Sequence, residues 1–161
     1  MSMLNNKSIL EAIVQKSGEG ETLSAMGITI SYKVVGTQSD GQWLVLEYLA
    51  PTQFSGPPPH VHKVTTEIFY VLEGCLTVET NGQATELGVG GLAFVPPGTA
   101  HTFANATNAP VKFLLVSSPA WLENYFTEMG EMLQNEPSWP PQDMSKVVAL
   151  MTKYDTFAPS N

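Results

Sequence analysis

The chain has 161 residues, which fits one domain, and 43% of them are apolar, which excludes a disordered chain. Its formal net charge is −8 at pH 7 and it contains no arginine, so we expect no binding to nucleic acid or to a membrane surface. No apolar run reaches the roughly 20 residues of a membrane-spanning helix, the N-terminus lacks a signal-peptide layout, and Cys75 is the only cysteine. These features exclude an internal disulfide framework and predict a cytoplasmic protein.

Residues 1–27 are expected to form a loosely structured N-terminal arm. Residues 8–16 carry a short amphipathic pattern, with apolar Ile9, Ala12 and Ile13, and this pattern predicts one helix before a loop at 17–20.

Residues 28–117 are expected to form an all-β unit. Short runs rich in β-branched and aromatic residues alternate with Gly, Pro and Asn, and they predict strands at 28–35, 43–50, 67–73, 76–80, 83–87, 92–95, 101–105 and 111–117. Asn81-Gly82 lies between two of these strands and is a strong signal for a two-residue hairpin. Short strands joined by such turns predict an antiparallel sandwich or barrel.

Residues 118–161 predict a two-helix appendage, so that the chain forms one domain overall. Ser118-Pro119 is typical of a helix start, and Leu122, Tyr125, Phe126, Met129 and Leu133 then follow helical spacing, with Gly130 weakening the middle. After a proline-rich break at 137–141, Asp143 is expected to cap a second helix. Its apolar face is formed by Met144, Val147, Val148, Met151 and Tyr154. We expect these faces to pack on the barrel or on a second subunit.

The three histidines of the chain fall in two clusters within the predicted β region. His60 and His62 are two residues apart, so on a strand they point to the same side, and the next strand returns Glu67 to that region. His101 comes from a distant strand that lies beside them in a closed barrel. Three imidazoles and one carboxylate suit a divalent Fe, Mn, Ni, Cu or Zn ion and leave positions for water, substrate or dioxygen. The alternative for these residues is a hydrogen-bond network without a metal.

The two histidine clusters resemble the two sequence motifs of the cupin superfamily, one motif each. The second segment fits in full, with Gly90, Pro96, Gly98, His101 and Asn105 at the expected spacing. The first fits from His60 through Glu67 to Gly74, but only three residues separate Gly56 from His60 where the usual pattern has five. This shortened opening is similar to that of small single-domain cupins of the quercetin 2,3-dioxygenase group. The resemblance implies an antiparallel β-jelly-roll barrel, carrying the C-terminal two-helix appendage, with one bound metal.

The absence of arginine bears on the substrate. Sites that hold carboxylates or phosphates favour the bidentate fork of arginine, and strand alternation points Lys63, the lysine nearest the ligands, away from them. A neutral or phenolic small molecule is therefore favoured. The same alternation from Glu67 and His101 predicts an inward-facing pocket lining, namely Phe69, Val71, Phe103 and Asn105. Trp121, Tyr125 and Phe126 either cover the mouth of the barrel or serve in packing or in a dimer contact.

The resemblance implies a metal-dependent dioxygenase similar to quercetin 2,3-dioxygenases, with Glu67 as a ligand and as the candidate general base. Two alternatives stay open. One is a small-molecule-binding or sensing barrel without turnover, and the other is a metal-dependent isomerase or hydro-lyase that acts on a neutral sugar or keto compound. Exposed strands and the apolar appendage predict a homodimer.

Overall fold

The computed structural model of the chain describes residues 10–25, 27–134, 136 and 141–160. Its strands are β1 (Thr22–Ala25), β2 (Ile28–Val34), β3 (Leu44–Ala50), β4 (Val61–His62), β5 (Thr66–Glu73), β6 (Leu76–Thr80), β7 (Gln83–Leu87), β8 (Leu92–Val95), β9 (His101–Ala104), β10 (Val111–Ser118) and β11 (Thr156–Phe157). Two helices follow β10 in the chain, α1 (Leu122–Leu133) and α2 (Met144–Lys153). A short 3-10 turn, Gly36–Gln38, joins β2 to β3.

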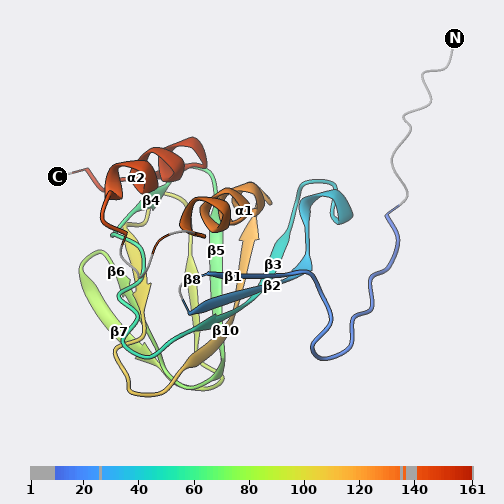
Figure 1. Cartoon of the computed structure of the whole chain (residues 1–161), viewed down its shortest axis with the longest axis horizontal. Helices are drawn as coiled ribbons and strands as arrows, with labels where there is room; N and C mark the ends of the chain where they lie inside the picture. Colours follow the sequence, from blue (N-terminus) through green and yellow to red (C-terminus); the bar gives the residue numbers. More distant parts are fainter. Residues whose placement is uncertain (1–9, 26, 135, 137–140, 161) are drawn as a thin grey trace, which may run out of the picture.

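The strands form an antiparallel jelly roll, which confirms the predicted fold class. A six-stranded sheet has the order β1-β2-β3-β10-β5-β8, a three-stranded sheet has the order β7-β6-β9, and β11 pairs with β4. The sheets are hydrogen-bonded as separate sheets rather than as one closed barrel, with an isolated bridge between His60 and His101. Both helices lie over one end of the sheets in Figure 1.

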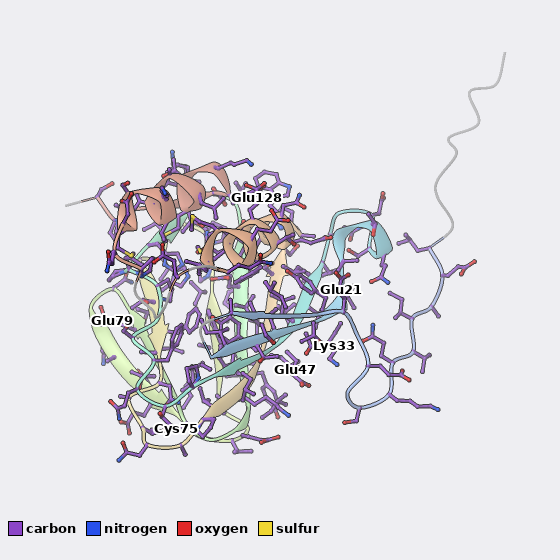
Figure 2. All side chains as sticks on the ribbon, in the orientation of Figure 1. Glu21, Lys33, Glu47, Cys75, Glu79 and Glu128 are labelled. Atoms are coloured by element: carbon purple, nitrogen blue, oxygen red, sulfur yellow. The ribbon has the colours of Figure 1, made fainter. Side chains whose placement is uncertain are left out.

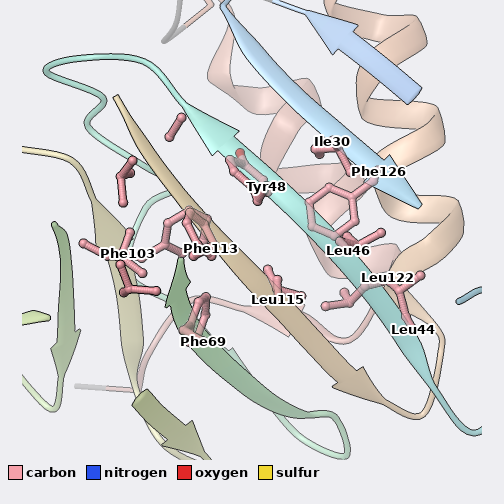
Figure 3. Close-up of a cluster of buried hydrophobic side chains, with 14 of the residues drawn as sticks. Ile30, Leu44, Leu46, Tyr48, Phe69, Phe103, Phe113, Leu115, Leu122 and Phe126 are labelled. Atoms are coloured by element: carbon pink, nitrogen blue, oxygen red, sulfur yellow. The ribbon is translucent and has the colours of Figure 1, made fainter. Parts of the chain in front are cut away.

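The core follows from the two-residue period of the strands. Along β3 and β10 every second side chain is buried, so that one face of each strand is apolar and faces inward. The rings of Phe69, Phe103 and Phe113 meet between the sheets, and Tyr48 stacks on Phe113 with centroids 4.9 Å apart (Figure 3). From α1, Leu122 and Phe126 join the same cluster.

All eight predicted strands are present, and no end differs from its prediction by more than one residue. Asn81 and Gly82 form the predicted hairpin turn with φ angles of 49° and 78°. Three strands were not predicted, namely β1, β4 and β11. Two of them, β4 and β11, have only two residues each, too few to show alternation, and the four residues of β1 include no aromatic side chain, unlike those of the equally short β8 and β9.

The expected N-terminal helix is wrong where the structure describes it. Residues 10–16 adopt no regular structure, and residues 8 and 9 lie outside the described part. A helix this short is marginal in water without a packing surface, and the side chain of Val14 is 90% exposed. The end of the predicted arm is instead β1, whose residues pair antiparallel with β2.

The appendage begins later than predicted. Ser118 is still paired with Thr66 on β5, so the strand must end before the chain can turn, and α1 starts at Leu122. Asp143 caps α2 as predicted, because its carboxylate accepts a hydrogen bond from the backbone N–H of Ser145. On the predicted apolar face of α2, Val147 and Met151 are buried as expected, but the prediction for Val148 is wrong, because this side chain is exposed. Most of the proline-rich break, residues 137–140, lies outside the described residues.

The two helices pack on each other as well as on the sheets. A second apolar cluster joins Met129 and Leu133 of α1 to Val147 and Met151 of α2. No helix in the described part of the chain is both long enough and apolar enough to cross a membrane.

Candidate metal centre

Four buried side chains from separate segments converge at the end of the sheets near the helices. His62 lies on β4, Glu67 on β5 and His101 on β9, and His60 is held beside His101 by the isolated bridge between them. One ligand atom from each residue lies within 4.8 Å of the corresponding atoms of the other three. The structure therefore brings together all four residues that the sequence predicts as ligands.

The three imidazole rings are oriented by backbone carbonyl groups. The Nδ1 atom of His60 lies 2.8 Å from the Pro58 carbonyl oxygen, and that of His101 lies 2.9 Å from the Thr99 carbonyl oxygen. The Nδ1 atom of His62 lies 2.8 Å from the carbonyl oxygen of Asp155. Because a carbonyl oxygen only accepts hydrogen bonds, each Nδ1 carries a proton, and Nε2 is the atom of each ring that binds either a second proton or a metal ion.

The carboxylate of Glu67 lies against two of these rings. Its Oε2 is 2.8 Å from Nε2 of His101 and 3.2 Å from Nε2 of His62. Burial by itself would raise the pKa of Glu67, but hydrogen bonds from His101 and His62 outweigh it and lower the pKa below the ordinary value. The group is thus an ionised carboxylate, which is the form that binds metals.

The pKa values of two imidazoles are displaced in opposite directions. For His60, burial and the neighbouring His101 lower the pKa to about 4, so this ring is neutral and its Nε2 lone pair is free. For His62, burial also acts to lower the pKa, but the hydrogen bond and the charge of Glu67 outweigh it and the pKa is raised. A cation of either kind, a proton or a metal ion, is therefore stabilised between His62 and Glu67.

This donor set fits a divalent transition-metal ion. Two ligands about 2.1 Å from one octahedral ion lie about 3.0 Å apart, and the spacings of 2.8 and 3.2 Å around Glu67 Oε2 bracket that value. Three imidazole nitrogens with one carboxylate oxygen suit Fe, Mn, Ni, Cu or Zn and leave coordination positions open on the ion. The carbonyl groups behind the rings are the partners that metal-binding histidines commonly have.

The four residues lie beside a cavity of about 780 Å³, a volume that includes space open to solvent. His60, His62 and Glu67 line it, and most of the remaining wall is apolar or aromatic. Tyr48 of β3, Phe103 of β9 and Phe54 of the loop after β3 contribute to the wall, and α1 contributes Tyr125, Phe126 and Met129. The helical appendage is thus part of the cavity wall, whereas exposed Trp121 is not.

Only one of the four predicted pocket residues lines this cavity. Phe103 does, but Phe69 and Val71 are fully buried among the core rings deeper between the sheets. Asn105 is fully buried as well and holds a turn, because its Nδ2 donates to the carbonyl oxygens of Pro51 and Ala109. Strand alternation identifies the inward side of a strand, but it does not distinguish the packed end of the interior from the open end.

Two tyrosines that line the cavity were missed as pocket residues. Tyr48 lies on the inward face of β3, so strand alternation could have identified it. For Tyr125, helical spacing does not distinguish a residue that packs in the core from one that covers the barrel mouth. Burial raises the pKa of both phenols, and the charge of Glu67 adds to the effect on Tyr125. Both phenols are therefore protonated and can donate a hydrogen bond to a ligand in the cavity.

No lysine belongs to the described wall of the cavity. Lys63 is exposed, and its Nζ lies 4.0 Å from the ring centroid of Phe157. Cys75 lies at the end of the sheets opposite the helices, where it cannot supply a ligand (Figure 2). The negative charge of Glu67 is therefore the nearest formal charge that a molecule in the cavity meets, apart from a bound metal.

The chain is similar to several known proteins. A model of the cupin domain family matches residues 45–117. The chain is 32% identical over 120 residues to a quercetin 2,3-dioxygenase of Bacillus subtilis, an alignment that covers 73% of this chain and 34% of that protein. It is 30% identical over 100 residues to a probable oxidoreductase of Hypocrea virens, with 56% of this chain and 46% of that protein covered. The chain thus spans between a third and a half of the length of these curated relatives.

Solved structures show the same architecture. An RmlC-like cupin from Shewanella frigidimarina aligns with a TM-score of 0.60 and 19% identity, and the alignment covers 71% of this chain and 96% of that one. At this level of identity the likeness shows the fold alone.

Proposed function

The chain carries a cupin domain and is similar to the quercetin 2,3-dioxygenase group, and we propose that it is a metal-dependent dioxygenase acting on a neutral or phenolic small molecule. The observation that carries this proposal is the position of the four-residue ligand cluster beside an apolar, aromatic cavity that contains no lysine in its described wall. Such a wall suits a flat organic molecule and disfavours a carboxylate or phosphate ester.

A redox-active divalent ion held by His60, His62, Glu67 and His101 would supply Lewis acidity toward a substrate oxygen and electron exchange with dioxygen. Glu67 takes the proton from a phenolic hydroxyl of the substrate. All its hydrogen bonds to described residues are made by Oε2, so Oε1 is available to receive that proton.

Tyr48 and Tyr125, which line the same cavity, orient the substrate. Their protonated hydroxyls donate hydrogen bonds to further oxygens of the molecule, as its rings pack against Phe103 and Phe126. The apolar wall excludes water from the activated ring, which limits side reactions of the deprotonated form.

The test is oxygen consumption with a panel of flavonols and catechols, using protein loaded separately with Fe²⁺, Mn²⁺, Ni²⁺ and Cu²⁺. We expect at least one metal and substrate pair to consume dioxygen and to incorporate both atoms of ¹⁸O₂ into product. Glu67→Gln should abolish this turnover. Glu73→Gln, the same change at an exposed position of the same strand, should leave it intact.

The other outcomes separate the competing functions. Ligand-dependent thermal stabilisation without product would indicate a binding or sensing protein, and product formed equally well without oxygen would indicate an isomerase or hydro-lyase. Either result overturns the dioxygenase proposal.

A further inference from the structure

His62 differs from the other two histidines in the origin of its orienting carbonyl group. The carbonyl groups that hold His60 and His101 each come from two residues earlier in the same loop. The carbonyl that holds His62 belongs to Asp155, which is 93 residues away and lies beyond both helices. The orientation of one ligand therefore depends on where the C-terminal segment docks.

Asp155 also binds the loop that connects two of the ligands. Its Oδ1 accepts a hydrogen bond from the backbone N–H of Lys63 at 3.0 Å. Its Oδ2 accepts from the backbone N–H groups of Val64 and Thr65, at 3.0 and 2.9 Å, and from the Thr65 hydroxyl at 2.9 Å. Because this loop joins His62 to Glu67, the carboxylate holds the separation between two ligands as well as one ring.

The backbone around Asp155 is shaped for this contact. The residue is 8% exposed and has a φ of 56°, a left-handed conformation that Asp and Asn tolerate better than most residues. The chain then continues as β11, in which Thr156 pairs with His62 itself. Among the described residues, the hydrogen bonds of the Asp155 carboxylate all go to the loop between His62 and Glu67.

We propose that Asp155 is a positioning residue of the metal centre, through which docking of the C-terminal strand and metal binding stabilise each other. This inference rests on the proposed function only in requiring that the four-residue cluster binds a metal. The coupling is reciprocal: a metal that fixes His62 must also tighten β11 against β4.

Asp155→Asn is the most informative variant. Asparagine keeps the size and the left-handed backbone, but whichever way its amide turns, the NH₂ group faces at least one backbone N–H group from which the carboxylate accepted a hydrogen bond. We expect its affinity for Zn²⁺ and Mn²⁺, measured by competition with a chelator, to fall about 10- to 100-fold. In the wild type, metal should slow hydrogen exchange of the β11 amides, and in the variant this protection should be lost.

Asp143→Asn is the matched control, because it alters a second capping aspartate of the same tail that touches no ligand. Its metal affinity should stay within about twofold of the wild type. The electron paramagnetic resonance spectrum of Cu²⁺-loaded Asp155→Asn should also show altered nitrogen hyperfine structure, which a loss of general stability would not produce. If Asp155→Asn is poorly folded, Thr65→Val removes a single hydrogen bond to Asp155 and should weaken the metal in the same direction.

The possible results separate this inference from the proposed function. A wild-type protein that binds none of these metals overturns both. A wild type that binds metal, together with an Asp155→Asn variant that binds it equally well and keeps the β11 protection, overturns only the role of Asp155.

Discussion

Two serines of this protein are buried, but only one of their hydroxyl groups is hydrogen-bonded within the described residues. Ser39 donates to the carbonyl oxygen of Trp43 at 2.8 Å and accepts from the Trp43 backbone N–H at 2.9 Å. Ser117, on β10 opposite Glu67, is fully buried, and its Oγ has no hydrogen-bond partner among the described residues. A buried polar atom without a partner destabilises the fold by about 1–3 kcal/mol, because it has lost its contacts with water.

The same substitution should therefore have opposite effects at the two sites. We expect Ser117→Ala to raise the free energy of unfolding by about 1 kcal/mol, and Ser39→Ala to lower it by about 1–3 kcal/mol. Urea denaturation of both variants under identical conditions measures the difference. A clear loss of stability in Ser117→Ala would mean that its hydroxyl is satisfied in solution.

At the level of elements, the contact between β1 and α1 depends on a glycine in the middle of the helix. A Cβ atom at Gly130 would lie 2.5 Å from Cδ1 and 2.6 Å from Cδ2 of Leu23, closer than real contacts allow. Gly130 weakened the helix prediction, yet it is the position that lets β1 approach α1. Glycine at this position costs about 1 kcal/mol in helix propensity relative to alanine, but it lets Leu23 pack against α1 and form part of the cavity wall.

A double-mutant cycle tests this contact. Alone, Gly130→Ala should leave stability nearly unchanged, because displacing the side chain of Leu23 offsets the gain in helix propensity. In a Leu23→Ala background, the same change should stabilise by about 1 kcal/mol, because the obstructing side chain is gone. Thermal or urea unfolding measures the change in the free energy of unfolding in each background. If Gly130→Ala changes it equally in both, the side chain of Leu23 does not limit the packing of β1 against α1.

At the level of the whole molecule, the outer face of the larger sheet is apolar at its β8 edge. Tyr70, Leu92 and Phe94 are 39%, 55% and 60% exposed, and Leu92 lies opposite Tyr70 in the pairing of β5 with β8. With a formal charge of −8, two copies of this chain repel each other, and the repulsion is weakest where uncharged surfaces such as this one meet.

We therefore expect a homodimer that uses this face. Light scattering should report twice the mass of one chain, and Phe94→Glu should shift the protein to monomer, because two like charges then meet near the symmetry axis. Val148→Glu, which places the same charge at an exposed apolar position of α2, should leave the dimer unchanged. A monomeric wild type contradicts the expectation.

Much of the fold and of the ligand set could be predicted because the signals are local. Strands were recognisable over four to eight residues, and His60, His62 and Glu67 stand at spacings that a strand and its return can bring together, whereas His101 comes from a distant strand that lies beside them in the folded chain. The cavity wall was less predictable, because α1 supplies much of it and helical spacing does not reveal what the helix covers.

Tertiary structure alone decided the contacts that span the chain. The two residues of β11 carry no periodic pattern, and nothing near Asp155 in the sequence indicates that its carbonyl faces His62. The same holds for β1, which becomes a strand because β2 offers it an edge and Gly130 leaves it room. Short-range periodicity encodes which face of an element is apolar, whereas the choice of partner depends on the summed burial and hydrogen bonding of the whole folded chain.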